Sequence, residues 1–257
     1  MFNQTSCALI GMVHTLPLPG SPNWQGDMSA ILKRARSDAE ALAGGGCDAI
    51  LIENMADLPY LNGQVYTETV AALAVVCHEL QSIGLPMGLQ ILAGANLQAL
   101  SVASTTGIDF IRVEGFAYGH LADEGWMNAC AGPLLRKRAQ LGKPIQIWAD
   151  VQKKHAAHAM TQDLSLKEIA EGHVFSGADA LIVTGRATGE PTPLNDLKQV
   201  KDAGLPTVVG SGVNPDNILE LSQLADALIV GSWLKIDGNW RNPVDPNRVA
   251  RLRAVLK

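Results

Sequence analysis

Short apolar runs alternate with longer amphipathic stretches along the whole chain, with a period of about thirty residues. The runs are rich in Val, Ile and Leu, which is typical of parallel strands covered by helices. The pattern predicts eight strands: Ala8–Val13, Ala49–Ile52, Met87–Leu92, Phe110–Val113, Ile145–Ala149, Ala180–Val183, Thr207–Val209 and Ala227–Val230.

The amphipathic stretches predict one helix after each strand, and most of these stretches end in a glycine that suits a left-handed C-cap. The predicted helices are Met28–Ala43, Thr67–Ser82, Leu97–Thr106, Gly125–Leu141, Leu166–Ser176, Leu194–Asp202, Pro215–Leu224 and Pro246–Leu256. Eight strands alternating with eight helices predict an α/β protein with a single (βα)8 TIM-barrel domain over residues 1–257. A doubly wound open sheet is the alternative, and the uninterrupted series favours closure.

Polar residues stand where most of the predicted strands end. In a TIM barrel these ends and the loops after them form the functional face. Side chains alternate along a strand, so Arg112 and Glu114 share one face. Unpaired charges inside a barrel would cost several kcal/mol each, so they must pair, bind a ligand or hold a metal.

The last two predicted strands both run into glycine and serine, at Gly210-Ser211-Gly212 and at Gly231-Ser232. Backbone NH groups at two such turns can converge on one anion, and glycine lets the backbone approach it closely. We therefore expect a phosphate site made of Gly185, Gly210, Ser211, Gly212, Gly231 and Ser232. Tight strand-to-helix turns without a ligand are the alternative.

The same face should also carry acid and base groups, because burial and neighbouring charges tune the proton affinity of carboxylates. Three acids are expected to transfer protons: Glu53, Asp150 and Glu114. Four basic side chains are expected to balance charge or assist: Arg112, Lys154, His14 and His155. Three polar residues are expected to contact substrate: Asn54, Gln90 and Thr184. A structural Arg112–Glu114 ion pair and a loop-capping role for Asp150 are the alternatives.

Composition limits the partners of the protein. With 47% hydrophobic and 18% charged residues the chain is typical of a globular protein. A net charge of −5 argues against nucleic acid as the main partner. The two short basic clusters, Arg136-Lys137-Arg138 and Lys153-Lys154, are expected on solvated faces or as local site charge.

Four cysteines without a C-x-x-C spacing indicate free thiols in a reducing compartment. We see no signal peptide and no apolar run long enough to span a membrane, so we expect a cytoplasmic protein, at most peripheral on a membrane. His155 and His158 do not have a strong zinc spacing, so no cofactor is expected. Metal-dependent hydrolysis by Glu53, Asp150 and His155 remains an alternative. A homo-oligomer stays open, although no motif marks an interface.

Several unusual residue combinations are distributed over nearly the whole chain. They are Ile10-Gly11-Met12-Val13-His14, Leu18-Pro19-Gly20-Ser21-Pro22, Glu53-Asn54 with Asp57 and Pro59, Thr67-Glu68-Thr69, Asp109-Phe110-Ile111-Arg112-Val113, Ala149-Asp150 with Lys154-His155, Thr184-Gly185 with Thr188-Gly189, Gly210-Ser211-Gly212-Val213, and Lys235 with Asp237-Gly238. Together they resemble the BtpA/SgcQ family.

The resemblance implies a TIM barrel similar to the ribulose-phosphate-binding barrels. The family is named for members associated with photosystem I biogenesis, peripheral on thylakoid membranes, whereas non-photosynthetic relatives look like enzymes of sugar or nucleoside metabolism. Many members have Asn-Val-Leu-Arg-Asn where this chain has Gln90-Ile91-Leu92-Ala93-Gly94, so the chain resembles the non-photosynthetic branch. We expect an enzyme for a small phosphorylated sugar or nucleoside-type substrate, with isomerase, lyase and glycosidic cleavage all open. A non-catalytic, peripherally membrane-associated assembly factor of the photosystem type is the alternative.

Overall fold

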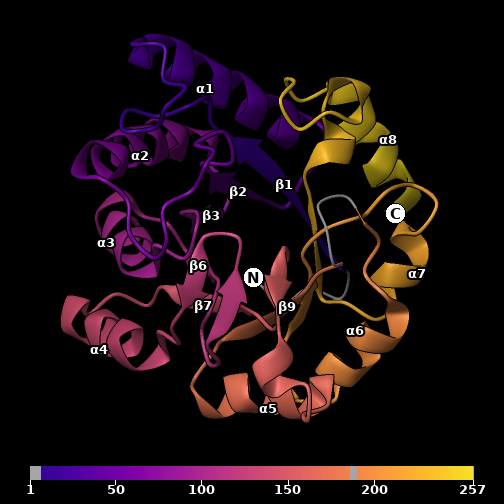
Figure 1. Ribbon diagram of the computed structural model, residues 1–257. Helices are drawn as coiled ribbons and strands as arrows, with labels where there is room; N and C mark the ends of the chain where they lie inside the picture. The colour runs from indigo at the N-terminus through magenta and orange to yellow at the C-terminus, as the bar shows by residue number, and fades with distance from the viewer. Residues whose placement is uncertain (1–6, 186–189, 257) are drawn as a thin grey trace.

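The computed structural model describes residues 7–185 and 190–256. Within these residues, eight parallel strands close into a barrel with helices around its outside (Figure 1). In the order in which they follow along the chain, the strands are β1 (Ala8–His14), β2 (Ala49–Glu53), β3 (Met87–Gln90), β4 (Phe110–Val113), β7 (Gln146–Asp150), β9 (Ala180–Val183), β10 (Thr207–Val209) and β11 (Ala227–Val230). Because β1 pairs with both β2 and β11, the sheet has no edge.

One α-helix lies between successive barrel strands or after the last one. The helices are α1 (Met28–Gly44), α2 (Thr67–Leu80), α3 (Asn96–Thr106), α4 (Ala131–Leu141), α5 (Leu166–Phe175), α6 (Leu194–Lys201), α7 (Ile218–Ser222) and α8 (Pro246–Leu256). Single turns of 3-10 helix cover Gln81–Ile83, Ala159–Thr161, Ser232–Leu234 and Ile236–Gly238. The predicted TIM barrel is confirmed.

The barrel interior has an apolar lower part and a polar mouth. Every second strand residue points inward, and the others pack against the helices. In the lower part, the rings of Phe110 and Trp148 stack with centroids 3.8 Å apart. A Cβ on Gly88 of β3 would lie 2.2 Å from Cζ of Phe110, so only glycine fits beside this ring. The same alternation points the last inward residues of five strands into the mouth: His14, Glu53, Gln90, Arg112 and Asp150.

A buried ion pair joins the two ends of the chain where the barrel closes. Lys235 is fully buried, and its Nζ donates to Asp38 Oδ2 and to the carbonyl of Met12, both at 3.0 Å. Asp38 also accepts from the Val244 amide at 2.8 Å and from Arg34 Nε at 3.2 Å. The last quarter of the chain is therefore tied to α1 and β1 by a satisfied polar cluster.

A small antiparallel sheet over the mouth was not predicted. It consists of β5 (His120–Ala122), β6 (Gly125–Met127) and β8 (Ala156–Ala157). The prediction of a helix over Gly125–Leu141 is wrong at its start, because α4 begins only at Ala131. Gly125 takes a φ of +103°, and a two-residue turn connects β5 and β6 into a hairpin.

The helix predicted at Pro215–Leu224 is shorter than expected. Before α7, side chains bond to the backbone in place of a helical turn: Asn214 Oδ1 accepts from the Asp216 amide at 2.8 Å, and Asn217 Nδ2 donates to the Gly212 carbonyl at 2.9 Å. Asparagine competes with the helix in this way, which explains the lost turn.

All four cysteines are free thiols. No helix in the described part of the chain combines the length and the apolar character needed to cross a bilayer.

Candidate functional site

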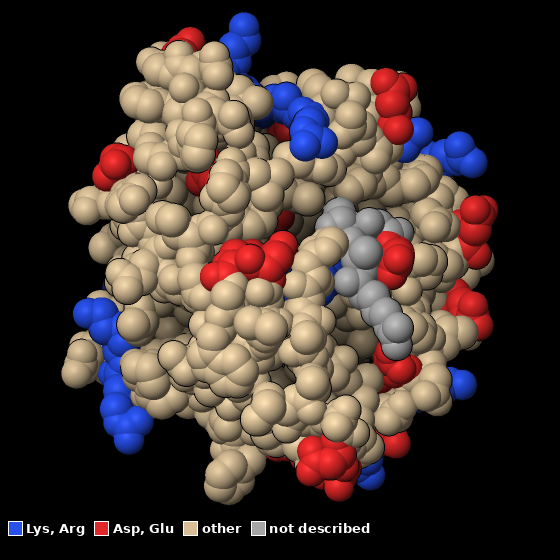
Figure 2. All heavy atoms as spheres, viewed as in Figure 1, with Lys and Arg blue, Asp and Glu red and all other residues tan. Residues whose placement is uncertain are grey.

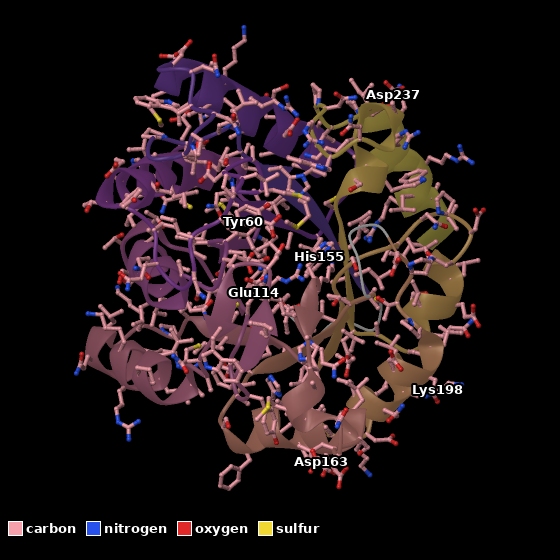
Figure 3. All side chains as sticks on the ribbon, in the orientation of Figure 1. Tyr60, Glu114, His155, Asp163, Lys198 and Asp237 are labelled. Carbon is pink, nitrogen blue, oxygen red and sulfur yellow. The ribbon has the colours of Figure 1, made fainter. Side chains whose placement is uncertain are left out.

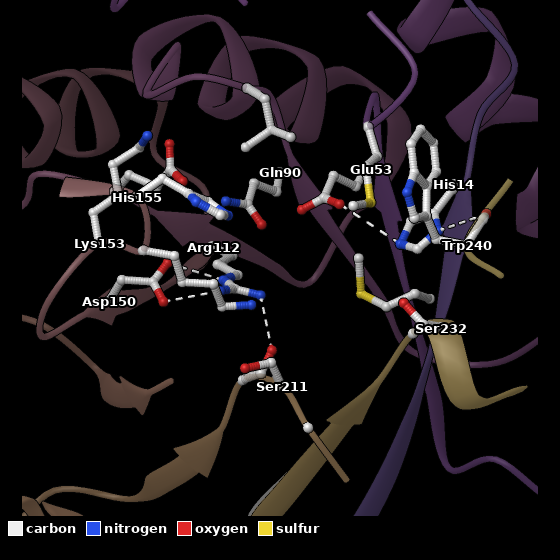
Figure 4. A pocket seen from close by; sticks show the side chains of 18 of the residues that line it. His14, Glu53, Gln90, Arg112, Asp150, Lys153, His155, Ser211, Ser232 and Trp240 are labelled. Atoms are coloured by element: carbon white, nitrogen blue, oxygen red, sulfur yellow. Dashed lines mark hydrogen bonds and ion pairs between the residues drawn. The ribbon is translucent and has the colours of Figure 1, made fainter. Parts of the chain in front are cut away.

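A cavity of about 550 Å³ opens at the carboxyl end of the barrel (Figure 4). We call it the main cavity. The predicted site residues that line it are His14, Glu53, Gln90, Arg112, Glu114, Asp150, Lys154, His155, Gly210, Ser211, Gly212, Gly231 and Ser232. Figure 3 shows Tyr60, Glu114 and His155 near the centre of the view, whereas Asp163, Lys198 and Asp237 lie toward the edge of the molecule. The barrel thus brings together side chains that are far apart in the sequence.

The structure does not place Asn54 in this lining. Its side chain is fully buried beside the cavity, where Oδ1 accepts from the Leu92 amide at 2.7 Å and Nδ2 donates to Asp57 Oδ2 at 2.9 Å. Its amide group therefore holds the loops after β2 and β3 together.

Thr184 and Gly185, which follow β9, also lie outside the lining. Thr184 Oγ1 is 3.5 Å from the Gln152 carbonyl. A Cβ on Gly185 would lie 2.6 Å from the carbonyl oxygen of Glu190, so this glycine allows two backbone segments to pack closely. Thr188 and Gly189 of the family-like motif lie outside the described residues.

Arg112 and Asp150 form a two-pronged ion pair at the centre of the site (Figure 4). Arg112 Nε and Nη2 each donate to one Asp150 oxygen at 2.9 Å, and Nη1 lies 3.4 Å from the Gly210 carbonyl. The alternative Arg112–Glu114 pair is not formed. Two parallel bonds between buried groups fix the guanidinium plane, with the cation directly beneath the Gly210 turn.

Glu114 is a buried acid of the cavity lining with a raised pKa. Burial raises the pKa of Glu114 to about 7, although the nearby Lys153 ammonium opposes this shift. Its Oε2 has no hydrogen-bond partner within the described residues. A carboxyl group with a pKa near neutrality can both give and take a proton at physiological pH.

Glu53 and His14 face each other across β1 and β2, with Oε2 and Nε2 3.6 Å apart. Burial raises the pKa of Glu53, and burial together with the Lys235 charge holds the pKa of His14 well below 6.5. The contact is therefore one between a neutral imidazole and a carboxyl group. His14 Nδ1 lies 3.4 Å from the Trp240 carbonyl, which can accept a hydrogen bond from this nitrogen in the tautomer that carries the proton there.

The two lysines after β7 differ in role. Lys153 was expected either on a solvated face or as local site charge, and it lies in the cavity lining: its side chain is buried and its Nζ pairs with Glu124 at 2.7 Å and with Asp123 at 3.5 Å. Lys154 forms no ion pair with a carboxylate of the described chain. Burial and the nearby Arg112 charge lower the pKa of Lys154 to about 8. The site thus holds one cation bound to the hairpin and one cation that faces the cavity.

The two glycine–serine turns meet at the main cavity, as the sequence predicts. Gly210 donates its NH to the Val183 carbonyl at 2.8 Å. In the described turns and loops, the NH groups of Ser211, Gly212 and Ser232 donate to no other backbone group. Ser211 Oγ is buried and has no partner within the same residues. These groups offer several donors to an anion in the cavity, and phosphate binding itself stays a prediction.

Part of the lining was not predicted. It comes from the loops after β2 and β11 and from the β5–β6 hairpin, and includes Met55, Tyr60, Asp123, Glu124, Trp240 and Arg241. Figure 2 shows acidic side chains near the centre of this face, where the hairpin lies in Figure 1. A two-residue acidic turn between Ala122 and Gly125 is the signal that could have revealed the hairpin.

No three His, Cys, Asp or Glu side chains of the described residues come together in a way that could hold a metal ion. His158 Nε2 is 3.0 Å from the Lys153 carbonyl. The expectation that no metal cofactor is used stays a prediction.

The sequence match over residues 5–257 now assigns the family. This chain belongs to the BtpA family. An uncharacterised mitochondrial protein of Caenorhabditis elegans is 42% identical over 98% of this chain and 93% of its own length. A protein of Synechocystis named photosystem I biogenesis protein BtpA is 38% identical over 96% of this chain and 87% of its own length.

Solved structures with the same fold come from enzymes of low sequence identity to this BtpA-family chain. Orotidine 5'-monophosphate decarboxylase of Methanocaldococcus jannaschii, complexed with the inhibitor BMP, aligns with a TM-score of 0.62 at 12% identity, over 98% of this chain and 99% of that one. Phosphoribosyl anthranilate isomerase of Thermus thermophilus aligns with a TM-score of 0.54 at 16% identity, over 97% and 98%. At such identities the likeness shows the fold alone.

Proposed function

We propose that this BtpA-family protein is an enzyme that acts on a small phosphorylated sugar or nucleoside-type substrate by acid/base catalysis. The observation that carries the proposal is that two glycine–serine turns and buried carboxyl groups from other strands line one cavity. Three buried polar atoms around it have no partner within the described residues: Gln90 Oε1, Glu114 Oε2 and Ser211 Oγ. Buried polar atoms are normally hydrogen-bonded, so their gathering supports a polar ligand at this place.

The phosphate group of the substrate binds at the two turns. The NH groups of Ser211, Gly212 and Ser232, with the Ser211 hydroxyl, donate to its oxygens, and Arg112 below Gly210 adds positive charge. Two structural neighbours are, by name, a monophosphate decarboxylase and a phosphoribosyl isomerase, which supports a phosphorylated substrate.

Proton transfer centres on Glu114, whose pKa of about 7 matches the working pH of a general acid or base. Glu53 is the second proton-transfer group, with neutral His14 beside it. Asp150 holds Arg112 in place, and the Lys154 ammonium balances negative charge that develops on the substrate.

Ligand-induced stabilisation tests the proposal. Melting temperatures are measured with inorganic phosphate, ribose 5-phosphate, a nucleoside monophosphate and unphosphorylated ribose. We expect the phosphorylated compounds to raise the melting temperature and ribose to leave it unchanged. The Ser211→Ala variant should bind ribose 5-phosphate about tenfold more weakly. Ser101→Ala, on the outer helix α3, is the matched control and should bind like the parent. Failure of every phosphorylated compound to stabilise the protein would overturn the proposal.

A second candidate is a non-catalytic assembly factor, which the name of the Synechocystis relative supports. The exposed side chains Leu121 and Trp126, which are direct cross-strand partners on the β5–β6 hairpin, offer an apolar contact surface. This candidate expects Leu121→Ser/Trp126→Ser to abolish co-sedimentation with membranes of the source cell. A protein that stays in the supernatant with or without the substitutions rules it out.

A further inference from the structure

A second, smaller hollow of about 310 Å³ adjoins the main cavity on the side of β1. We call it the side pocket. Its lining comes from the loop after β1, from α1, and from the loops after β2 and β11, and includes Thr15, Asn23, Arg34, Leu58, Trp240 and Arg241. Four residues line both hollows: His14, Leu58, Trp240 and Arg241. A ligand in the main cavity therefore has the side pocket as its immediate neighbour.

The two hollows differ in whether acidic side chains line them. Carboxylates of Glu53, Glu114 and Asp150, together with those of the β5–β6 turn, line the main cavity. No aspartate or glutamate of the described chain lines the side pocket, where the charged side chains are Arg34 and Arg241. A pocket with two guanidinium groups and no acid in its lining favours an anionic group.

A buried hydroxyl group points to the same conclusion. Thr15 is only 2% exposed, and its Oγ1 has no hydrogen-bond partner within the described residues. A buried hydroxyl without a hydrogen bond costs free energy unless a ligand supplies the missing partner. A hydroxyl can donate that hydrogen bond to an anion.

The two arginines are held in place by neighbouring groups. Arg34 Nε lies 3.2 Å from Asp38, which also pairs with the buried Lys235, so one carboxylate serves two cations. Arg34 Nη2 donates to the Arg241 carbonyl at 3.0 Å, and the Arg241 guanidinium lies over the Trp240 ring at 4.2 Å. Arg241 forms no ion pair with a carboxylate of the described residues.

We infer that the side pocket is a second anion subsite, which binds a phosphate or carboxylate group at the end of the substrate opposite the phosphate held by the glycine–serine turns. The substrate class is then a sugar-type compound with two anionic ends. This inference rests on the proposed function, since a substrate whose phosphate binds at the turns occupies the main cavity, next to the side pocket.

Matched pairs of ligands that differ by one anionic group test the subsite. Dissociation constants are measured for ribulose 5-phosphate against ribulose 1,5-bisphosphate, and for ribose 5-phosphate against 5-phosphoribonate. We expect at least one of the second anions to strengthen binding about tenfold in the parent protein. A gain from the bisphosphate alone assigns the pocket to phosphate, and a gain from the phosphoribonate alone assigns it to carboxylate.

Two substitutions test whether the gain in affinity from the second anionic group arises in the side pocket. Thr15→Val keeps the shape of the side chain and removes its hydroxyl, and Arg241→Gln removes the exposed charge. Each should lower the gain in affinity from the second anion several-fold. Thr15→Val, which changes no residue of the main cavity lining, should also leave binding of the monophosphates unchanged. Arg251→Gln on the outer helix α8 is the matched control and should keep the full gain.

The outcomes separate the two proposals. If monophosphates bind but neither second anion strengthens binding, the subsite is overturned and the proposed function stands. A gain that survives both substitutions also overturns the subsite. If no phosphorylated compound binds at all, both proposals fall.

Discussion

The lower part of the barrel and its mouth are built by the same strands and the same alternation, but with opposite chemistry. Below, inward side chains such as Phe110 and Trp148 stack in full contact. Above, the next inward positions carry Arg112, Asp150 and Glu53, which are charged residues and yet only 4–7% exposed. The lower part gains stability from packing, whereas the mouth keeps costly buried charge in a defined geometry. The apolar packing that stabilises the barrel and the polar groups of the candidate site therefore lie at different heights along the same strands.

The largest effect is expected in the lower part. Phe110→Ala should lower the free energy of unfolding by about 4 kcal/mol, because it leaves a cavity beside Trp148. Denaturant titration measures the loss. Gly88→Ala should be strongly destabilising alone, but should recover stability when combined with Phe110→Ala, because its methyl group then fills the freed space. Equal effects of Gly88→Ala in both backgrounds would contradict this packing argument.

The second-largest loss of stability is expected from breaking the Arg112–Asp150 ion pair at the mouth. Asp150→Asn leaves the buried Arg112 guanidinium without its carboxylate and should cost about 3 kcal/mol of stability. The double variant Arg112→Met/Asp150→Leu removes both charges and should recover most of that loss while abolishing ligand binding. If the double variant is less stable than Asp150→Asn, the ion pair stabilises the fold by more than its desolvation cost. The mouth would then contribute to stability as the lower part does.

Glu114→Gln should stabilise the protein, by about 2 kcal/mol at pH 8. The pKa of Glu114 is about 7 in the folded protein and has an ordinary value of 4.5, so the folded state binds more protons between these values. Stability of the parent therefore falls as pH rises from about 4.5 to about 7, and the glutamine variant lacks this fall. The unfolding curves of the parent and of Glu114→Gln should coincide at pH 4.5 and should diverge at pH 8. Activity should be lost in the variant at every pH.

The smallest effect concerns His14, whose folded pKa is held well below the ordinary 6.5. The unfolded chain takes up a proton as pH falls below about 6.5 and the folded protein does not, so stability should decrease there. His14→Gln should weaken that decrease, as thermal melts between pH 5 and pH 7 would show. An equally steep loss of stability in His14→Gln and in the parent would contradict this assignment.

The sequence predicted most of the fold, because buried parallel strands and capped helices leave strong local patterns. It also placed Glu53, Arg112 and Asp150 at the mouth, since those positions follow from alternation alone. The partner of Arg112 could not be predicted, because it depends on the register between β4 and β7, where Arg112 lies opposite Trp148. The burial of Lys153 depends on the β5–β6 hairpin, whose three-residue strands are too short for a periodic signal.

The buried Lys235–Asp38 pair has a consequence for how the barrel finds its alignment. The inward and the outward residues of β1 and β11 are almost all apolar, so hydrophobic burial alone discriminates only weakly between registers. A slip by one residue would move the ammonium of Lys235 away from Asp38 and Met12. Both charges would then be buried without a partner. The pair thus disfavours barrels in which β1 and β11 are shifted, and it holds the loop after β11, which lines part of the mouth, against β1.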